Sequence, residues 1–505
     1  MKNNIGSIPL RYRVTIDREQ CMECERCIEN CSYGVFRRDG DRILINSRRC
    51  TACHRCLAYC PRDAITITEQ PCDYRNHPVW TRQTREAIYN QARTGKIILA
   101  GMGSVADLPV IFDHLMLDAS QVTTPPTDPL REPVELRTYL GKKPSRLEFG
   151  RGPDGEIELA TELTPNLMLK TPIMLGHMSY GAISLNAQIS LARAAKETGT
   201  YMGTGEGGLH AGLYPYQDRM IVQVASGRFG VNIDYLERGA AIEIKLGQGA
   251  KPGIGGHLTG EKVSRDVSRT RMIPEGSDAI SPAPHHDIYG IEDLSQLVRS
   301  IKEATEWKKP VFAKIAAVNN TAENVAAVAR ASVDAVVIDG FRGGTGAAPR
   351  VFRDHVGIPL EVAVASADRE LYRQGLRNEV SLIACGSIRE SADIVKAIAL
   401  GADAVYIGTA ALVAMGCRVC GNCYQGLCPW GIATQRPDLV QRLDPDVASK
   451  QVANLIHAWT MEITELMGAA GINSIESLRG NRDRLRGYML DENLLNVLDV
   501  KPVGA

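Results

Sequence analysis

"SLIACGSIRESADIVKAIALGADAVYIGTAALVAMG", residues 381–416, is the stretch on which the fold prediction depends. It contains two short apolar runs, at 381–387 and 404–410, and each run includes a glycine followed by a hydroxyl residue. A segment with helical periodicity comes after each of these turns. This alternation of strand, turn and helix is typical of parallel strands joined by helices, because a crossover must lead from the end of each strand back to the start of the next.

The same pattern occurs six more times upstream, at 172–179, 201–208, 221–227, 241–247, 311–317 and 335–341. Eight strand–helix units predict an α/β fold, a closed (β/α)8 barrel of the TIM type. A doubly wound open sheet is the alternative. It would require a Gly-rich dinucleotide fingerprint after the first strand, and "GHMSYGAIS" at 176–184 is not one.

Two cysteine runs precede the barrel, "CMECERCIENC" at 21–31 and "CTACHRCLAYCP" at 50–61. Their doubled spacing is that of two-cluster bacterial ferredoxins, in which the fourth cysteine of each run ligates the other cluster. We expect two [4Fe–4S] clusters in a small α+β ferredoxin-like domain. The ligands would be Cys21, Cys24, Cys27 and Cys60 for one cluster, and Cys50, Cys53, Cys56 and Cys31 for the other. A pair of structural zinc sites is the alternative, but zinc would not need the third cysteine of each run.

The turns after the seventh and eighth strands carry Gly386 with Ser387 and Gly408 with Thr409. Barrels bind phosphate at these two positions, so the sequence favours a phosphate-bearing cofactor. Because the upstream clusters move single electrons, FMN is the expected cofactor, since a flavin converts one-electron delivery into two-electron chemistry.

The predicted organisation has four parts. They are a ferredoxin-like domain at 1–72, an irregular arm at 73–165, the FMN-binding barrel at 166–445 and a C-terminal helical extension at 446–505. The arm is rich in proline, glycine and charge, and we expect no chemistry there.

Composition excludes several classes of function. Lys and Arg together number 58, as do Asp and Glu, so no net charge favours nucleic acid or a membrane surface. The longest apolar run, 404–416, is shorter than the ~20 residues that span a bilayer. The first residues lack the apolar core of a signal peptide, so we expect a soluble cytoplasmic protein without disulfides. Twelve of its 14 cysteines fall into three tight groups, which indicates metal binding. Cys72 and Cys385 lie outside the clusters and are expected to be inert packed thiols.

Several longer motifs resemble the FMN-binding synthase domain of glutamate synthase across 166–435. They are "TGEGG" (204–208), "QVASGRFGV" (223–231), "IKLGQGAKPGIGGHLTGEKV" (244–263), "SPAPHHDIYGIEDLSQL" (281–297) and "DGFRGGTGAAP" (339–349). Because a ferredoxin-like domain precedes this region, the chain is similar to archaeal-type glutamate synthases. The resemblance implies an oxidoreductase acting on CH–NH2 donors. It would convert 2-oxoglutarate to L-glutamate through 2-iminoglutarate, with reduced FMN as the hydride donor.

The resemblance also implies site residues. Its 2-oxoglutarate-binding positions are occupied here by Lys245, Gln248, Lys251 and Arg271. A dicarboxylate needs cations, and Arg suits bidentate carboxylate binding, whereas Lys acts as a point charge. Glu206 and Gln248 would orient the imine, and Glu206 is a candidate proton donor. His257 stands where the family usually has glutamine, so the substrate contact that this glutamine makes in the family is not predicted here.

The resemblance and the barrel geometry together indicate the FMN-binding residues. They are Met178, Ser179, Gln223, Lys314, Gly343, Gly344, Gly386, Ser387, Gly408 and Thr409. Lys314 ends the fifth strand, where a cation can stabilise negative charge at N1 of reduced flavin.

A third group of cysteines, "GCRVCGNCYQGLCPWG" at 416–431, directly follows the eighth unit. A cluster there would lie close to the flavin. The family has a [3Fe–4S] cluster on three cysteines, and Cys417, Cys423 and Cys428 match its spacing. Cys420 is additional and gives a run close to four-ligand runs, so both [3Fe–4S] and [4Fe–4S] remain open. A zinc site is the remaining alternative.

The sequence has no nicotinamide fingerprint, so ferredoxin or a separate NAD(P)H-oxidising flavoprotein subunit is the expected electron donor. Glutaminase domains of this family use an N-terminal cysteine. The chain begins with Met1, and Cys21 is assigned to a cluster, so ammonia is expected from a separate glutaminase subunit in an oligomeric assembly. Two other functions stay open: an N-methylglutamate-forming homologue and a non-catalytic flavin and iron–sulfur electron relay.

Overall fold

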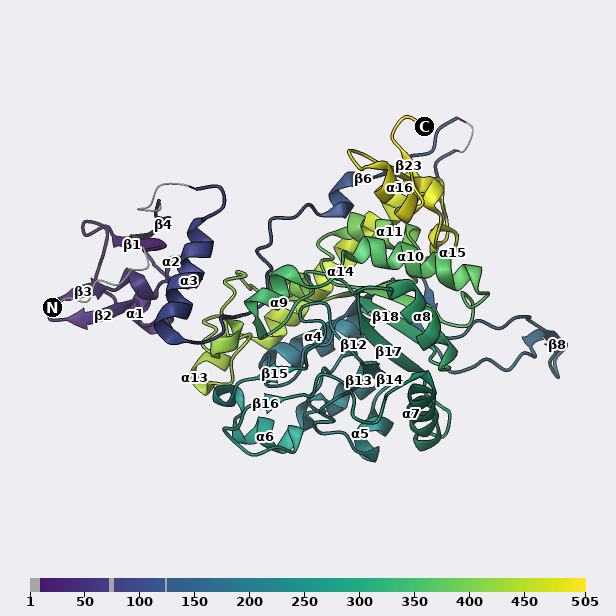
Figure 1. Ribbon diagram of the computed structural model, residues 1–505, viewed down its shortest axis with the longest axis horizontal. Coiled ribbons are helices and arrows are strands. Elements are labelled where there is room, and N and C mark those ends of the chain that lie inside the picture. Colours follow the sequence, from purple (N-terminus) through teal and green to yellow (C-terminus); the bar gives the residue numbers. More distant parts are fainter. Residues whose placement is uncertain (1–9, 72–76, 123–124) are drawn as a thin grey trace.

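The computed structural model describes residues 10–71, 77–122 and 125–505. Cys72, predicted to be an inert thiol, lies outside the described residues. The eight predicted strands form one closed parallel barrel in the predicted order, so the barrel is confirmed and the open sheet is excluded (Figure 1). The strands are β11 (Ile173–Leu175), β12 (Met202–Gly203), β13 (Met220–Ala225), β14 (Ala241–Lys245), β17 (Val311–Ala316), β18 (Ala335–Asp339), β20 (Ser381–Cys385) and β21 (Ala404–Ile407).

Side chains alternate between two apolar layers, because successive strand residues point to opposite faces. On β20, Leu382 and Ala384 belong to the layer between strands and helices, whereas Ile383 belongs to the core inside the barrel. The inner core also contains the fully buried Phe312 and Tyr406. The barrel interior is therefore packed, and an open site can form only at its ends.

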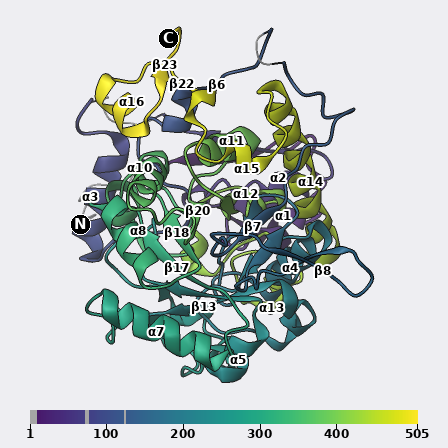
Figure 2. The ribbon, with the colours of Figure 1, turned by 90° about the vertical axis from the view of Figure 1, so that its right-hand side faces the viewer.

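Helices surround the barrel (Figure 2). They include α4 (Leu185–Thr198), α5 (Ile233–Arg238), α7 (Ile291–Ala304), α8 (Thr321–Arg330), α10 (Leu360–Arg373), α11 (Ser391–Ala399) and α12 (Thr409–Ala414). Helix α4 illustrates their construction: the Ser184 side chain caps its N-terminus, Gly199 ends it with φ 70°, and its alanines face the core. Within the predicted C-terminal extension, α14 (Pro445–Ala469) packs against α4 and α11.

The N-terminal domain has the predicted ferredoxin-like α+β fold. Strand β1 (Tyr12–Ile16) pairs antiparallel with β4 (Ile65–Glu69), and β2 (Phe36–Asp39) pairs with β3 (Arg42–Ile45). Short helices α1 (Arg26–Asn30) and α2 (Arg55–Ala58) carry the third cysteine of each run. Glu25 and His54, at the same place in the two runs, share a left-handed conformation with φ near 60°. The repeat in sequence is thus also a repeat in backbone conformation.

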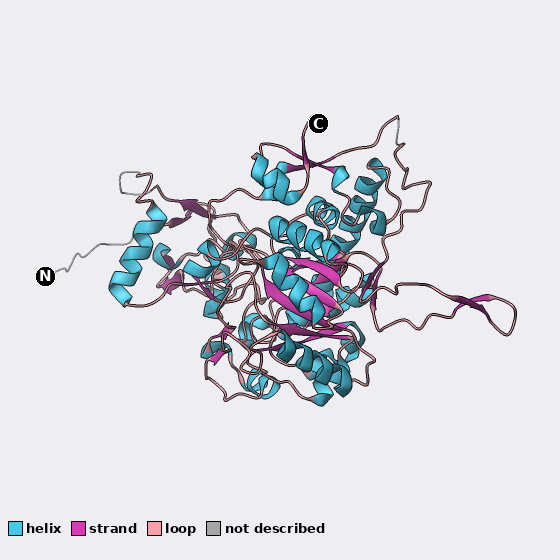
Figure 3. Cartoon of the chain, turned by 45° about the vertical axis from the view of Figure 1, so that its right-hand side comes forward, coloured by secondary structure: helices cyan, strands magenta, loops and turns pink. Residues whose placement is uncertain are grey.

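The arm is tied to distant parts of the chain. After α3 (Arg82–Thr94), β5 (Leu99–Ala100) pairs with β19 (Ala348–Pro349), and β6 (Leu115–Leu117) pairs with β22 (Leu485–Gly487). Strands β7 (Thr138–Leu140) and β10 (Leu167–Leu169) pair with each other and contribute three leucines to the inner barrel core. The hairpin of β8 (Phe149–Arg151) and β9 (Ile157–Leu159) extends away from the body (Figure 3). Within the described ranges, no helix combines the length and the apolar character that a membrane crossing requires.

A buried charge network fixes the last two barrel strands to the C-terminal segment. Asp403, directly before β21, accepts hydrogen bonds from Arg377 at 2.8 Å, Arg479 at 2.7 Å and the Leu382 N–H at 2.7 Å. Burial raises the pKa of Asp403, but these guanidinium groups and Lys143 outweigh burial and lower the pKa to about 2. Asp403 therefore stays ionised in the folded protein.

Asp403→Asn should lower the free energy of unfolding by about 3–5 kcal/mol, because it leaves buried guanidinium groups without their charge partner. The loss should be largest above about pH 4, where the unfolded carboxyl is ionised too. It should shrink as the pH falls towards about 2, because the folded carboxyl of the wild type then protonates. Thermal unfolding followed by circular dichroism at several pH values measures this. Asp438→Asn, which removes an exposed partner of Arg436, is the matched control and should have little effect. Equal melting temperatures for the wild type and Asp403→Asn would contradict the prediction.

Candidate functional site

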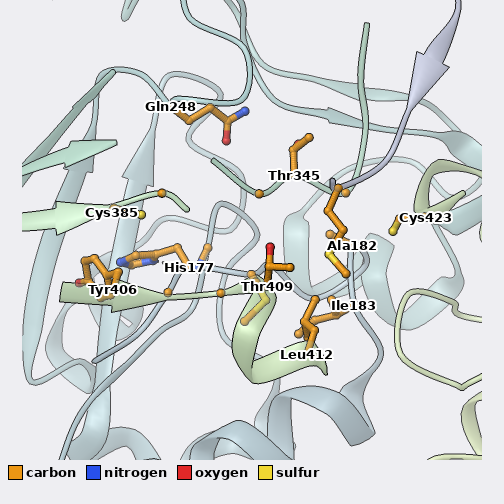
Figure 4. A pocket seen from close by; sticks show the side chains of 18 of the residues that line it. His177, Ala182, Ile183, Gln248, Thr345, Cys385, Tyr406, Thr409, Leu412 and Cys423 are labelled. Carbon is orange, nitrogen blue, oxygen red and sulfur yellow. Dashed lines mark hydrogen bonds between the residues drawn. The ribbon is translucent and has the colours of Figure 1, made fainter. Parts of the chain in front are cut away.

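A cavity of about 610 Å³ opens at the C-terminal ends of the barrel strands. Figure 4 shows its lining, with His177, Cys385 and Tyr406 on one side, Cys423 on another, and Gln248 and Thr345 between them. Its size lies within the range of small-molecule and cofactor sites, ~300–1,000 Å³.

One pole of the cavity is formed by the turns after β20 and β21. Gly386 and Ser387 both have positive φ, at 103° and 62°. Gly408 precedes α12, whose first residue, Thr409, also lines the cavity. The first N–H groups of a helix have no partner within the helix, so this turn offers donors to an anion.

Beneath the cavity lies a buried polar network. Lys314 pairs with Asp339 at 3.1 Å, and Gln223 donates to Glu243 at 2.7 Å. Burial lowers the pKa of Lys314, but the neighbouring acids, Asp339 first, raise it above its ordinary value. Lys314 is therefore an ammonium group that faces the cavity. Cys385, expected to be an inert packed thiol, instead lines the cavity with its Sγ 3.9 Å from Lys314 Nζ.

A second pole carries an excess of positive charge. Lys245 Nζ lies 3.5 Å from Glu206 Oε2, which also accepts a hydrogen bond from the Ser281 hydroxyl. Lys251 is 2% exposed and donates to the Ala347 carbonyl at 2.8 Å. Burial and the charge of Lys245 lower the pKa of Lys251 to about 7. Two lysines thus share one carboxylate, so this pole has more positive than negative groups.

The eight N-terminal cysteines form two groups. A small cavity is lined by Cys21, Cys24, Cys27 and Cys60. In the other group, burial raises the pKa of Cys56 to about 12, and Cys53, Cys31 and Cys50 add to the shift because they are close. Within the described ranges, no three His, Cys, Asp or Glu side chains are arranged to hold a single metal ion. The sulfur-only donor sets and their crossed membership fit iron–sulfur clusters.

The third group follows α12 and lies between the cavity and the N-terminal domain. Cys423 lines the cavity, and burial raises the pKa of Cys417 to about 12, with Cys423, Cys428 and Cys420 adding to the shift. The loop touches the N-terminal domain directly. The Trp430 indole donates to the Cys53 carbonyl at 3.2 Å, and the Ser32 hydroxyl donates to the Leu427 carbonyl at 2.6 Å.

The contact between the two parts also includes Tyr33 and Arg442. Arg442 donates to the Glu29 carbonyl at 2.6 Å. The Tyr33 hydroxyl is buried without a well-formed hydrogen bond, and the Cys420 thiol is the side chain it approaches. The three cysteine groups therefore lie in series, and the last of them reaches the cavity.

Comparison with known proteins gives the family. A model described as a conserved region in glutamate synthase matches residues 107–473, and one for a 4Fe-4S dicluster domain matches residues 13–61. The chain is 66% identical to the archaeal glutamate synthase [NADPH] of Methanocaldococcus jannaschii, over 98% of this chain and 99% of that protein. The chain belongs to the archaeal-type glutamate synthase family.

Other proteins also match the chain. The archaeal-type glutamate synthase [NADPH] of Thermotoga maritima is 54% identical over 98% of both chains. The glutamate synthase [NADPH] large chain of Bacillus subtilis is 37% identical over 68% of this chain, which is 22% of its own length. Among solved structures, a mandelate oxidase with (S)-4-hydroxymandelic acid aligns over 77% of this chain and 93% of its own, with a TM-score of 0.47 and 14% identity.

Most residues predicted for this archaeal-type glutamate synthase are brought together at the cavity. Those lining it are Met178, Ser179, Glu206, Gln223, Lys245, Gln248, Lys251, Lys314, Gly344, Gly386, Ser387, Gly408 and Thr409. Gly343 does not line it; a Cβ there would lie 2.8 Å from Asp339 Oδ1, so this glycine permits close packing beneath the cavity. His257 does line it, and burial followed by the charge of Lys251 lowers its pKa.

Arg271 is placed differently from the prediction. It ends α6 (Arg265–Arg271), is 2% exposed and does not line the cavity. Its guanidinium donates to the Ser179 hydroxyl at 2.8 Å and to the Tyr180 carbonyl at 2.9 Å. The geometry therefore supports Arg271 as a residue that positions Ser179 rather than one that binds a carboxylate in the cavity.

Several lining residues were not predicted from the sequence, among them His177 and Ser104. His177 follows β11, accepts a hydrogen bond from the Gly205 N–H at Nδ1, and has Nε2 3.2 Å from Glu243. Since Nδ1 is an acceptor, the proton of the neutral ring belongs on Nε2. Its position at a strand end was the available signal. Ser104 lies in the arm, where no chemistry was expected, and only the tertiary fold brings it to the cavity.

Arg271→Lys should destabilise the protein by about 1–3 kcal/mol, because a lysine cannot supply the planar set of donors to Ser179 and Tyr180. Thermal unfolding is the measurement. Arg269→Lys, on an exposed position of the same helix, is the control and should leave the melting temperature unchanged. Equal melting temperatures for the two variants would contradict the structural role of Arg271.

Proposed function

We propose that this member of the family is the catalytic subunit of a glutamate synthase, which aminates 2-oxoglutarate reductively to L-glutamate through 2-iminoglutarate with FMN in the barrel. The observation that carries the proposal is a single cavity that joins three features. These are a glycine-rich anion-binding turn, a pair of lysines that share one carboxylate, and a cysteine loop. A relay of electrons would need neither lysine.

The residues present fit FMN. The turns at Gly386 and Gly408 suit the phosphate, and a Cβ at Gly408 would have open space around it. Lys314 offers a cation to the flavin ring. The buried Asp339 Oδ1 and Tyr406 hydroxyl have no hydrogen-bond partner among the residues that the structure describes. When bound, reduced FMN would supply a hydride to the imine carbon.

The second pole fits a dicarboxylate. Lys245 and Lys251 would each balance negative charge of 2-oxoglutarate, and the Gln248 amide can hydrogen-bond the keto or imino group. Burial raises the pKa of Glu206, but Lys245, Lys251 and Arg271 outweigh it and lower the pKa. Glu206 is therefore a carboxylate that accepts a hydrogen bond from the imine nitrogen. We infer that it orients the imine, and that it can act as a proton donor only after it has itself taken up a proton from solvent, which becomes easier when the lysines turn to the substrate.

The supply of electrons and nitrogen completes the proposal. Residues 1–72 would receive electrons from ferredoxin or an NAD(P)H-oxidising flavoprotein subunit, and the relatives named glutamate synthase [NADPH] favour the latter. The cysteine loop at 417–428 would pass them into the barrel of residues 166–445. The arm at 73–165 and the helices of 446–505 would support it. Ammonia would come from a separate glutaminase subunit.

The proposal is tested with purified holoprotein under anaerobic conditions. The protein receives 2-oxoglutarate, a chemical reductant and either ammonium, methylamine or [amide-15N]glutamine, and the products are analysed by mass spectrometry. Glutamate from ammonium is expected, with little label from glutamine until a glutaminase is added. Product from methylamine alone would favour the N-methylglutamate alternative. No product, together with an FMN spectrum that saturating 2-oxoglutarate leaves unchanged, would favour a relay.

Affinity for 2-oxoglutarate should fall as the pH rises above about 7. Lys251 has a pKa of about 7 in the empty cavity, and a bound carboxylate raises that pKa because it favours the charged form. Above pH 7, binding must therefore take up a proton, and the affinity should drop by up to tenfold per pH unit. Titration of the flavin spectrum between pH 6 and 8.5 measures this.

The variant Lys251→Met should bind 2-oxoglutarate about 1.5–3 kcal/mol more weakly than the wild type and lose this pH dependence. Exposed Lys308→Met is the control, and a pH-independent wild type would contradict the assignment.

Cys420→Ala should convert the loop cluster from a four-iron to a three-iron cluster. The four loop thiols lie together and Cys420 faces Tyr33, so we expect four ligands in the wild type. The variant should gain an S = 1/2 electron paramagnetic resonance signal when oxidised and lose one iron by chemical analysis. Cys385→Ala, outside all three cysteine groups, should do neither. An oxidised three-iron signal in the wild type that survives added iron and reductant would contradict four ligands.

A further inference from the structure

Lys262 lies between the cavity and the cysteine loop, and neither the predicted substrate site nor the predicted FMN site contains it. It ends the short 3-10 helix Gly260–Lys262, lines the cavity and is 2% exposed. Its ammonium donates to the Ala182 carbonyl at 2.7 Å and to the Cys423 carbonyl at 3.2 Å. One side chain thus connects the segment after β11 with the loop after α12.

The positive charge of Lys262 has no acidic partner. Among the described residues, no carboxylate lies within 4.0 Å of its ammonium, and the two carbonyls use two of its three donors. Burial first and then the charge of Arg271 lower its pKa to about 8, although the thiols of Cys423 and Cys428 act to raise it. A buried ammonium without a counter-charge is costly, so the site is incomplete without an anion.

The cysteine loop is built tightly against this cation. A Cβ on Gly426 would lie 3.1 Å from Lys262 Cγ, so the loop backbone passes directly over the lysine stem. Thr259, three residues before Lys262, donates to the Tyr424 carbonyl at 3.3 Å. The segment 259–262 therefore holds the loop at Cys423 and Tyr424. The nearest source of negative charge is the set of loop cysteines once they are thiolates.

We propose that Lys262 is the buried counter-charge of the iron–sulfur cluster on Cys417, Cys420, Cys423 and Cys428, and that it raises the reduction potential of that cluster. The inference rests on the loop cluster of the proposed function and is independent of the substrate. A cluster held by thiolates is anionic, and reduction adds one more negative charge. A cation in a low-dielectric setting stabilises the reduced form more than the oxidised form. Electrons from the N-terminal clusters would therefore collect beside the cavity.

Three variants separate charge from hydrogen bonding. Lys262→Met removes both, Lys262→Gln keeps an N–H donor for the two carbonyls without the charge, and Lys262→Arg keeps the charge. Lys396→Met is the matched control, because Lys396 is a half-buried lysine that donates to the Phe112 carbonyl far from the loop. The measurement is an anaerobic redox titration of each holoprotein, followed by electron paramagnetic resonance, with the N-terminal clusters as internal reference.

We expect the loop cluster to move to a more negative midpoint potential in both Lys262→Met and Lys262→Gln, while the N-terminal clusters stay unchanged. Lys262→Arg and Lys396→Met should resemble the wild type. Should Met and Gln instead lose the loop iron while Arg retains it, the charge role is equally supported, because the cation then stabilises the assembled cluster.

Four results would overturn the inference. An unshifted loop cluster in Lys262→Met would show that the charge is irrelevant to it. A wild-type potential in Lys262→Gln would assign the effect to hydrogen bonding alone. Loss of the loop iron from Met, Gln and Arg variants alike would assign Lys262 to packing. A wild type with only N-terminal clusters would refute the loop cluster of the proposed function and this inference together, and iron analysis distinguishes that case from the others.

Discussion

The backbone pairing of β21 with β11 is the interaction on which the rest of the site depends. It closes the barrel with Ile173 opposite Val405, and the Gly176 N–H extends it by donating to the Ile407 carbonyl at 2.8 Å. The segment that follows β21 is thereby placed beside the segment that follows β11. The anion-binding turn at Gly408 adjoins His177, and the cysteine loop reaches the segment of Ala182. Without this closure, no single cavity could join a phosphate site to a cysteine loop.

The sequence predicted features that repeat along the chain and missed those that depend on distant partners. Eight strand–turn–helix units and two spaced cysteine runs carry their own geometry, so the barrel and the ferredoxin-like domain could be predicted. The arm could not, because β5, β6 and β7 are two or three residues long and each pairs with a strand elsewhere. Arg271 shows a similar limit in the site. Its residue type suited a carboxylate, but the direction in which the end of α6 faces decided its contacts.

Buried lysines divide the cavity into regions of different charge. Lys314 has an acidic partner and is kept charged, whereas Lys251 and Lys262 have too few acids and their pKa values fall to about 7 and about 8. A protein that buries cations without partners loses stability for it, and such sites are common where a ligand completes the charge balance. The imbalance marks two places for anions, one at the mouth of the barrel and one at the cysteine loop. His177 had only its position at a strand end as a signal in the sequence, and Lys262 had none, since its significance comes from what surrounds it.

The arm's pairings also bear on how the chain assembles. Strand β6 pairs with β22, whose residues Leu485–Gly487 lie far along the chain, while the last of β1 to β4 ends at Glu69. Contacts between such distant segments form slowly, because a long loop must close before they are made. The ferredoxin-like domain can therefore fold early, but it cannot dock against Trp430 until synthesis has passed that residue. The N-terminal domain and the barrel thus form at different times, and the docking of one onto the other is a late step.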